Sequence, residues 1–223
     1  MKRYTILPLI VLMALLFSCR KWDDFKKYIS NGEITYTGKM DSVKVYSGKQ
    51  RVMLYGLLKS DPKLQKVVVS WDNDVNSVSF DYTKQYPGVD TFSRTFPVSE
   101  GVKSFKVQTF DSEGNKSVNV FAIGTSYGET FRKRLSNRNI VSLDFNDAGG
   151  RVNWDQMDMS TGPQFTELLY TNTAGAAVKI VAPVTETTTQ LPGLTAGTAL
   201  KYRTIFRPEA TAIDTFAGSF KER

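Results

Sequence analysis

The side chains that most often carry out chemistry in proteins are scarce in this sequence. Its 223 residues include no histidine and one cysteine, Cys19. Without an imidazole there is no base for a Ser-His-Asp or Cys-His couple, and zinc or non-haem iron sites usually need histidine or several cysteines. Carboxylate chemistry and hard-cation binding are still possible. Because most catalytic and metal-binding chemistry is excluded, we expect no metal, no cofactor and no catalysis.

Carboxylates supply two candidates. Asp72, Asp74 and Asn76 alternate as oxygen ligands of Ca²⁺ do, but the glycine and bidentate glutamate of an EF-hand loop are missing. A polar hairpin turn needs only such Asn and Asp residues, and we favour that interpretation. A carboxylate-based glycan hydrolase is the alternative function, although spacing alone selects no catalytic pair from acids such as Asp23 and Asp24.

Aromatic and basic side chains are candidates for ligand binding. The rings of Tyr82, Tyr86 and Phe92 cluster near one turn. They are candidates for stacking on a sugar, but we favour packing at the turn and a strand edge. Four basic residues gather farther along the chain: Arg132, Lys133, Arg134 and Arg138. They could hold anionic glycans or lipid headgroups, or simply solvate a linker. No nucleic-acid-binding motif is visible, so we expect no nucleic acid partner.

The N-terminus has the pattern of a secretory signal. Basic Lys2-Arg3 precedes the apolar stretch Tyr4–Phe17, which is too short to span a bilayer. The sequence Leu16-Phe17-Ser18-Cys19 resembles a bacterial lipobox, in which the cysteine thiol receives a diacylglycerol group and becomes the new N-terminus. This resemblance implies a signal peptide at 1–18, lipidation of Cys19 and a membrane-anchored protein. An ordinary signal with a stray cysteine, or an uncleaved anchor, is the alternative.

The rest of the chain is predicted to be a tether followed by short strands. In the tether, 19–38, apolar residues at helical spacing favour one or two helical turns. The first set of strands is predicted at 42–46, 51–57, 64–71, 76–82, 91–98, 103–110 and 116–123, and the second at 151–155, 165–171, 177–181, 187–191, 199–206 and 213–216. Many short strands without a long helix are typical of β-sandwiches, whose cores we expect to contain Trp71 and Trp154.

An internal repeat divides the strands into two sets. Lys106–Phe110 matches Lys201–Ile205 at an offset of 95 residues, and Trp71-Asp72-Asn73 echoes Tyr170-Thr171-Asn172. A repeat of this length predicts two similar domains. We place them at 39–126 and 127–223, joined within 124–139.

Two stretches resemble parts of fibronectin type III domains. Leu191, Leu194 and Thr198 match the corner between the fifth and sixth strands, although Leu200 stands where the corner tyrosine would be and Tyr202 follows two residues later. In the first half, the stretch from Phe105 to Ser117 resembles the last hairpin of such a domain. The resemblance implies an all-β fold of two tandem immunoglobulin-like or fibronectin type III-like β-sandwiches.

The whole chain is similar to an uncharacterised family of Bacteroidetes lipoproteins built on such domains. The stretches that carry the likeness are 23–29, 32–39, 41–45, 202–204 and 212–216. Members of that family accompany outer-membrane glycan-uptake or surface-display systems. The likeness implies an outer-membrane, lipid-anchored protein. The charged run after Cys19, with the paired acids Asp23 and Asp24, resembles an export tag for the cell surface, an inward-facing position being the alternative. The protein's expected role is that of a non-catalytic binding or spacer module for glycan or for an outer-membrane protein partner.

Overall fold

The computed structural model describes residues 36–59, 63–84 and 88–223. The predicted signal peptide, Cys19 and the tether up to residue 35 lie outside the described residues. Thr37–Arg223 forms one compact unit that holds all the strands. No helix among the described residues combines the length and apolar character that crossing a membrane would require.

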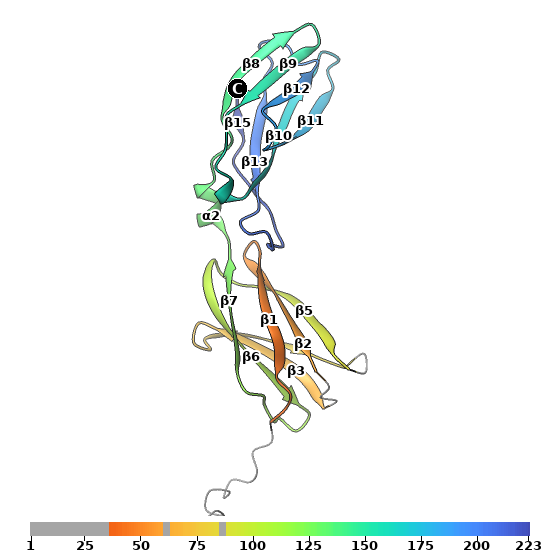
Figure 1. Ribbon diagram of the computed structural model, residues 1–223, viewed down its shortest axis with the longest axis vertical. Coiled ribbons are helices and arrows are strands. Elements are labelled where there is room, and N and C mark those ends of the chain that lie inside the picture. The colour runs from red at the N-terminus through yellow and green to blue at the C-terminus, as the bar shows by residue number, and fades with distance from the viewer. Residues whose placement is uncertain (1–35, 60–62, 85–87) are drawn as a thin grey trace, which may run out of the picture. The chain divides into compact units, whose positions relative to one another are not determined.

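The first seven strands form two antiparallel sheets (Figure 1). One sheet has the order β1-β2-β5 and the other the order β4-β3-β6-β7. The strands are β1 (Met40–Ser47), β2 (Arg51–Leu58), β3 (Leu64–Trp71), β4 (Asn76–Asp81), β5 (Asp90–Pro97), β6 (Gly101–Asp111) and β7 (Val120–Ser126). Exposure alternates along β2 and β6, as expected for strands with one face toward a core and one toward solvent.

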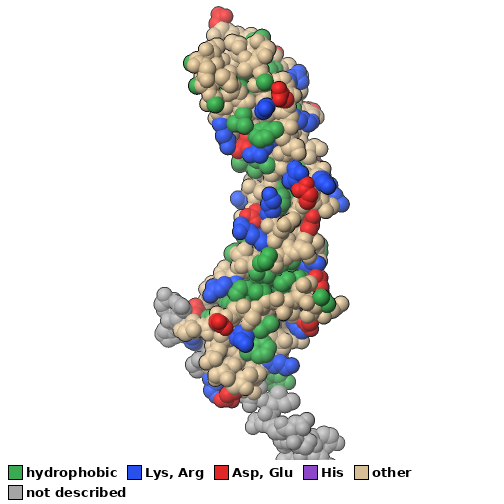
Figure 2. Space-filling view, turned by 180° about the vertical axis from the view of Figure 1, so that it is seen from behind, with side chains coloured by type: hydrophobic (Ala, Val, Ile, Leu, Met, Phe, Trp, Pro, Cys, Tyr) green, Lys and Arg blue, Asp and Glu red, His purple; other side chains and the backbone are tan. Residues whose placement is uncertain are grey.

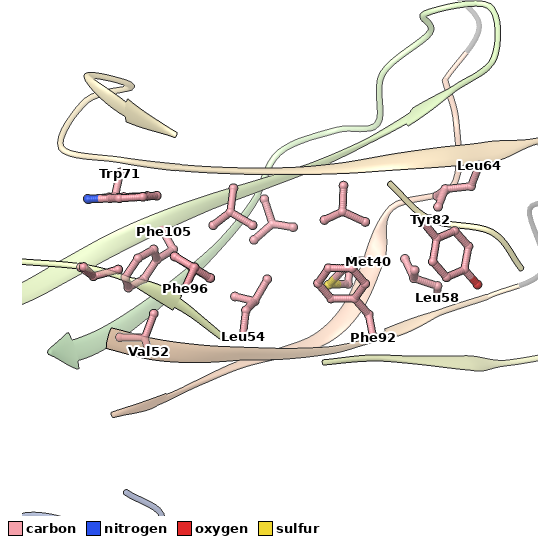
Figure 3. Close-up of a cluster of buried hydrophobic side chains, with 14 residues drawn as sticks. Met40, Val52, Leu54, Leu58, Leu64, Trp71, Tyr82, Phe92, Phe96 and Phe105 are labelled. Atoms are coloured by element: carbon pink, nitrogen blue, oxygen red, sulfur yellow. The ribbon is translucent and has the colours of Figure 1, made fainter. Parts of the chain in front are cut away.

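The core of this first sandwich is rich in aromatic rings. Figure 3 shows side chains from both sheets pointing toward one another, with Trp71 near one end of the cluster and Tyr82 near the other. The Trp71 ring lies 5.9 Å from that of Phe105 and 5.6 Å from that of Phe96, between centroids. Large aromatic side chains bury much apolar surface, so they account for a large share of core stability. The prediction that Trp71 belongs to the core is confirmed.

The second sandwich repeats this arrangement. Its sheets have the orders β12-β9-β8 and β11-β10-β13-β14, with β15 also pairing with β13. The strands are β8 (Ile140–Asn146), β9 (Gly149–Trp154), β10 (Pro163–Thr171), β11 (Ala177–Pro183), β12 (Thr188–Pro192), β13 (Lys201–Phe206), β14 (Phe216–Ala217) and β15 (Lys221–Glu222). A separate buried cluster, which contains Trp154, forms its core and confirms the second tryptophan prediction.

The two sandwiches are related strand by strand. Val69 of β3 pairs with Val107 of β6, and Leu168 of β10 pairs with Tyr202 of β13. The match of Trp71 with Tyr170 places Val69 opposite Leu168 in the repeat, and the offset of 95 residues places Val107 opposite Tyr202. The paired residues of the first sandwich therefore correspond to the paired residues of the second. The predicted fold class, two tandem fibronectin type III-like β-sandwiches in an all-β chain, is therefore confirmed by strand order and register.

The tyrosine hydroxyl that a fibronectin type III corner would use comes from a different strand. Leu200, at the expected position, is fully buried. Instead, the hydroxyl of Tyr170 on β10 donates a hydrogen bond to the main-chain oxygen of Pro192 at the end of β12. This bond ties the two sheets of the second sandwich together at the same corner.

Strand β8 and helix α2 (Glu129–Arg134) are among the elements that were not predicted from the sequence. Strand β8 lies at the edge of its sheet and exposes Val141 and Phe145, so it lacks a clear alternation. Helix α2 follows β7 directly. Its N-cap residue, Gly128, has no side chain to cap it, and the Glu100 carboxylate accepts hydrogen bonds from the main-chain N–H groups of Thr130 and Phe131 instead.

The turn between β1 and β2 is hydrogen-bonded to the long loop between β13 and β14. The Ser47 hydroxyl donates to Glu209 at 2.6 Å, and the Ser47 carbonyl accepts from the main-chain N–H of Ile213. Asp214 accepts two hydrogen bonds from the guanidinium of Arg51, at 2.6 and 2.9 Å. These contacts join the first sandwich to the second within the Thr37–Arg223 unit.

Candidate ligand-binding site

A cavity of about 500 Å³ lies beside helix α2, and we call it the junction pocket. It is lined by Tyr127, Phe131, residues 134–139, residues 156–158, Ser160, Thr161, Phe206 and Pro208. The volume is within the range of roughly 300–1,000 Å³ that is usual for small-molecule sites. The lining combines aromatic and aliphatic side chains with amides, hydroxyls and charged groups, a mixture typical of such sites.

Aromatic rings form one side of the junction pocket. The rings of Tyr127 and Phe131 lie 4.7 Å apart between centroids, and Phe131 packs edge-on against Phe216 at 5.1 Å. Phe216 is buried, whereas Tyr127 and Phe131 are partly exposed. Phe216 therefore supports the two rings from behind and leaves part of their surface available to a ligand.

Tyr127 is held by several contacts. Its hydroxyl donates to Glu209 at 2.8 Å, its main-chain N–H donates to the Gly48 carbonyl, and its carbonyl accepts from the N–H of Gln50. Burial, together with the neighbouring Glu209 carboxylate, raises the pKa of the Tyr127 hydroxyl to about 12. The phenol is therefore neutral at physiological pH, and its proton is engaged by Glu209.

Asn137 and Arg138 contribute buried polar groups. The Asn137 amide accepts from the Thr204 N–H at 2.8 Å and donates to the Ser219 carbonyl at 2.6 Å. Arg138 is 4% exposed, and its guanidinium donates to the carbonyls of Asp155 and Glu186 and lies 5.3 Å from the Trp154 ring centre. Burial lowers the pKa of Arg138. Arg138 is therefore a fixed cation inside the fold and does not belong to a solvent-exposed basic group.

The other three basic candidates behave differently from one another. Arg132 forms a two-pronged ion pair with Glu129 and also reaches the Ser219 hydroxyl. Lys133 is exposed and does not line the junction pocket, whereas Arg134 is exposed and does line it. On the face shown in Figure 2, basic and acidic side chains are interspersed. Arg134 is thus the member of the predicted group that a pocket ligand can reach.

A short 3₁₀ turn, η2 (Met159–Thr161), contributes to another side of the junction pocket. The Asp158 side chain accepts a hydrogen bond from the Ser160 N–H at 2.9 Å and caps this turn, and hydrogen bonds from Ser160 lower the pKa of Asp158. The turn ends at Gly162, which has a left-handed conformation with φ of 78°. The Gly162 carbonyl accepts from the Arg207 N–H, which fixes this wall against the loop after β13.

The aromatic cluster predicted near the β4–β5 turn is packed differently. Phe92 is 1% exposed and lies in the first core, where its ring contacts that of Phe80. Tyr82 is also buried, and its hydroxyl donates to Asp90 at 2.8 Å. Tyr86 lies outside the described residues. Neither Phe92 nor Tyr82 offers an exposed ring face for a sugar, because both rings are needed to fill the core.

The Asp72–Asn76 segment is the hairpin turn between β3 and β4. Asp72, Asn73 and Asp74 all have positive φ values, between 53° and 66°. Asp72 pairs with Lys103, and Asp74 with Lys106 on the neighbouring strand. These carboxylates are neutralised by lysines, and the described residues contain no cluster of three or more potential metal ligands there or elsewhere.

Sequence reasoning found Arg134 but missed the aromatic side of the junction pocket. Tyr127, Phe131 and Leu135 recur at intervals of four residues, which is the spacing of one face of a helix. That signal could have predicted both α2 and the side of it that lines the junction pocket. The contributions of Phe206 and Met157 depend on long-range packing and have no local signature.

Comparisons with known proteins find one matching family and several similar solved structures. The chain belongs to the DUF4998 family, a domain of unknown function, whose model matches residues 19–216. No curated protein matched. The FN1–FN3 domains of chicken CNTN1 are similar in structure, with 13% sequence identity and a TM-score of 0.44 over 86% of this chain. The chain spans 66% of that segment. A two-domain fibronectin type III segment of chicken tenascin has 10% identity and a TM-score of 0.33, covering 82% of this chain and 97% of the segment.

Proposed function

We propose that this protein is a lipid-anchored, non-catalytic module that binds glycan at the outer membrane through the junction pocket. The observation that carries the proposal is the pocket itself, where two partly exposed aromatic rings stand beside amide, hydroxyl and guanidinium groups. Sugars present an apolar ring face and many hydroxyls, so they are bound by this combination of surfaces.

The proposed location follows from the N-terminal sequence. The basic start, the short apolar stretch and the lipobox-like Leu16–Cys19 support cleavage before Cys19 and acylation of its thiol. The family match begins at the same cysteine. Labelling of cells with radioactive palmitate tests the anchor. The wild-type protein should incorporate label and Cys19→Ala should not, and an unlabelled wild type would refute acylation.

A binding function without cleavage fits the charges of the junction pocket. Glycoside hydrolysis ordinarily uses two carboxyl groups on either side of the scissile bond. Among the described residues that line the pocket, Asp158 is the single carboxylate, and it caps the η2 turn. We therefore expect a bound oligosaccharide to be recovered intact after prolonged incubation with the protein, as checked by chromatography.

A glycan array probed with the full chain in detergent tests the binding function. We expect Phe131→Ala to weaken binding by about tenfold or more, because loss of a stacking ring removes on the order of 1.4 kcal/mol or more. The matched control is Phe121→Ala, which removes an exposed ring on β7. Circular dichroism verifies that both variants are folded.

Two results would reject glycan binding at the junction pocket. One is the absence of binding to any glycan on the array together with recovery of one membrane protein in a pull-down, which would identify a protein-binding module instead. The other is binding that Phe131→Ala and Phe121→Ala weaken to the same extent, which would place the glycan elsewhere on the surface.

A further inference from the structure

We infer that the junction pocket selects an acidic saccharide and that Arg134 binds its carboxylate. This inference rests on the proposed function, since it specifies which class of glycan the pocket takes. Three features support it: the sign of the charge around the pocket, the availability of one guanidinium, and the position of that guanidinium relative to the exposed rings.

The charged groups that line the pocket sum to a positive value. They are the guanidinium groups of Arg134 and Arg138 and the carboxylate of Asp158, while Tyr127 is neutral. Four further carboxylates lie nearby but do not line the pocket. Glu129 is paired with Arg132, Glu209 accepts hydrogen bonds from the hydroxyls of Tyr127 and Ser47, and Asp155 and Glu186 lie near the buried Arg138. A cavity with a net positive lining favours an anion over a neutral ligand, more strongly where water is partly excluded.

Arg134 is the cation in this lining that a ligand can engage. The guanidinium of Arg138 is buried and already donates to two main-chain carbonyls. Arg134 is exposed, and its charge is not offset by a carboxylate in any ion pair among the described residues. A planar guanidinium matches the geometry of a carboxylate and forms two parallel hydrogen bonds with it.

The position of Arg134 on helix α2 places it beside the aromatic rings. Phe131 and Arg134 are three residues apart on one helix, so their side chains are on neighbouring positions of the same face, and both line the pocket. Lys133, the residue before Arg134 on the helix, does not line the pocket. A pyranose stacked on Phe131 would therefore present a ring carboxylate to Arg134 and not to Lys133.

The test compares acidic oligosaccharides with their uncharged esters. The full chain in detergent is titrated calorimetrically with galacturonate, glucuronate and mannuronate trisaccharides, each paired with its fully methyl-esterified form. We expect at least one acid to bind about tenfold or more tightly than its ester, as a charge-assisted pair of hydrogen bonds would give. Arg134→Ala should lose that preference, whereas Lys133→Ala, with the same change in charge on the same helix, should keep it.

The outcomes separate this inference from the proposed function. Equal binding of acids and esters, or equal effects of Arg134→Ala and Lys133→Ala, would overturn the acidic-saccharide inference while leaving glycan binding in place. Binding of no saccharide would reject the proposed function and the inference with it. Binding to vesicles containing phosphatidylglycerol that Arg134→Ala abolishes, without saccharide binding, would assign the pocket to lipid headgroups and overturn both.

Discussion

Phenylalanine side chains in this chain differ in their contribution to folding stability according to how deeply they are buried. Phe105 of β6 is fully buried and contacts the rings of Trp71 and Phe96, whereas Phe121 of β7 is 63% exposed. Truncating a buried phenylalanine removes its transfer free energy and leaves a cavity, while an exposed ring contributes little to folding.

We therefore expect Phe105→Ala to lower the free energy of unfolding by about 3–5 kcal/mol and Phe121→Ala to change it by less than about 0.5 kcal/mol. Urea denaturation followed by circular dichroism measures both variants under one set of conditions. Equal destabilisation of the two variants would contradict the assignment of Phe105 to the core.

Asp214 should make folding stability sensitive to acid. The hydrogen-bonded Arg51 guanidinium, assisted by the Lys49 N–H, holds the pKa of the Asp214 carboxyl below its ordinary value of 3.8. A lowered folded-state pKa means that this pairing contributes its full stability above the ordinary pKa. The contribution is lost as the pH falls through the lower folded-state value.

For Asp214→Asn we expect a melting temperature about 2–4 °C lower at pH 7 and a weaker dependence on pH between about 5 and 2. Thermal melts across this range measure both effects. Asp147→Asn, which changes an exposed loop carboxylate, serves as the control and should follow the wild-type profile. An Asp214→Asn profile parallel to that of the wild type would contradict the pairing.

At the residue scale, the sequence predicted part of the junction pocket. Arg134 could be identified because charge is visible in a sequence, and the missing histidine was equally visible. The distinction between Arg134 and Arg138 could not be made, because it depends on two carbonyls and the Trp154 ring that approach from distant strands. For Phe92 and Tyr82, packing at the turn and a strand edge was favoured over sugar stacking. Their place in the core could not be predicted for the same reason, since burial is a property of long-range packing.

At the scale of elements, the wall of the junction pocket depends on one backbone conformation. Gly162 ends the η2 turn with φ of 78°, and a Cβ atom there would lie 1.9 Å from the Arg207 carbonyl oxygen. Gly175, in the β10–β11 turn, has nearly the same φ of 76°, but a Cβ atom there would meet nothing within 4 Å. A side chain at either position would therefore have the conformational cost of a positive φ. At position 162 it would also clash with the Arg207 carbonyl oxygen.

Gly175→Ala should cost about 1 kcal/mol of folding free energy, and Gly162→Ala clearly more. Gly162→Ala should also weaken ligand binding at the junction pocket, because the η2 turn must move away from Arg207. Chemical denaturation and ligand titration of the two variants measure these effects. Similar stability losses in both would show that the Gly162 clash relaxes without cost.

Strands with one buried face could be predicted from the sequence, because their apolar residues alternate. A strand without a buried face could not. The expected 64–71 strand coincides with β3, whose valines alternate toward the core. Strand β8 was missed because its exposed edge position removes the alternation. Helix α2 is only six residues long, and its one periodic signal is the spacing of Phe131 from Tyr127 and Leu135, which flank it and were not considered.

At the scale of the whole molecule, the two sandwiches have separate cores. The first buried cluster is formed within β1–β7 and the adjoining residues, and the second within β8–β13 and the residues that adjoin them. The repeat in the sequence predicted this duplication, because each half carries its own set of alternating strands. The hydrogen bonds between the β1–β2 turn and the β13–β14 loop involve residues far apart in the sequence, so no local pattern could predict them.

Matched substitutions should therefore act on one sandwich at a time. Leu54 and Leu168 are both fully buried, one in each core, and each Leu→Ala change should cost about 2–5 kcal/mol. By hydrogen–deuterium exchange, Leu54→Ala should speed exchange in β1–β7 and Leu168→Ala in β8–β15. Faster exchange throughout both sandwiches in either variant would show that they unfold as one cooperative unit.

The contact between Trp154 and Arg138 also has a practical consequence. The indole ring packs against a guanidinium that lines the junction pocket, and its N–H donates to the Thr189 hydroxyl. Indole emission responds to the electric field and polarity around the ring, so a charged ligand entering the cavity should change the fluorescence of Trp154. The chain therefore contains a built-in optical reporter with which ligands can be screened without any attached dye.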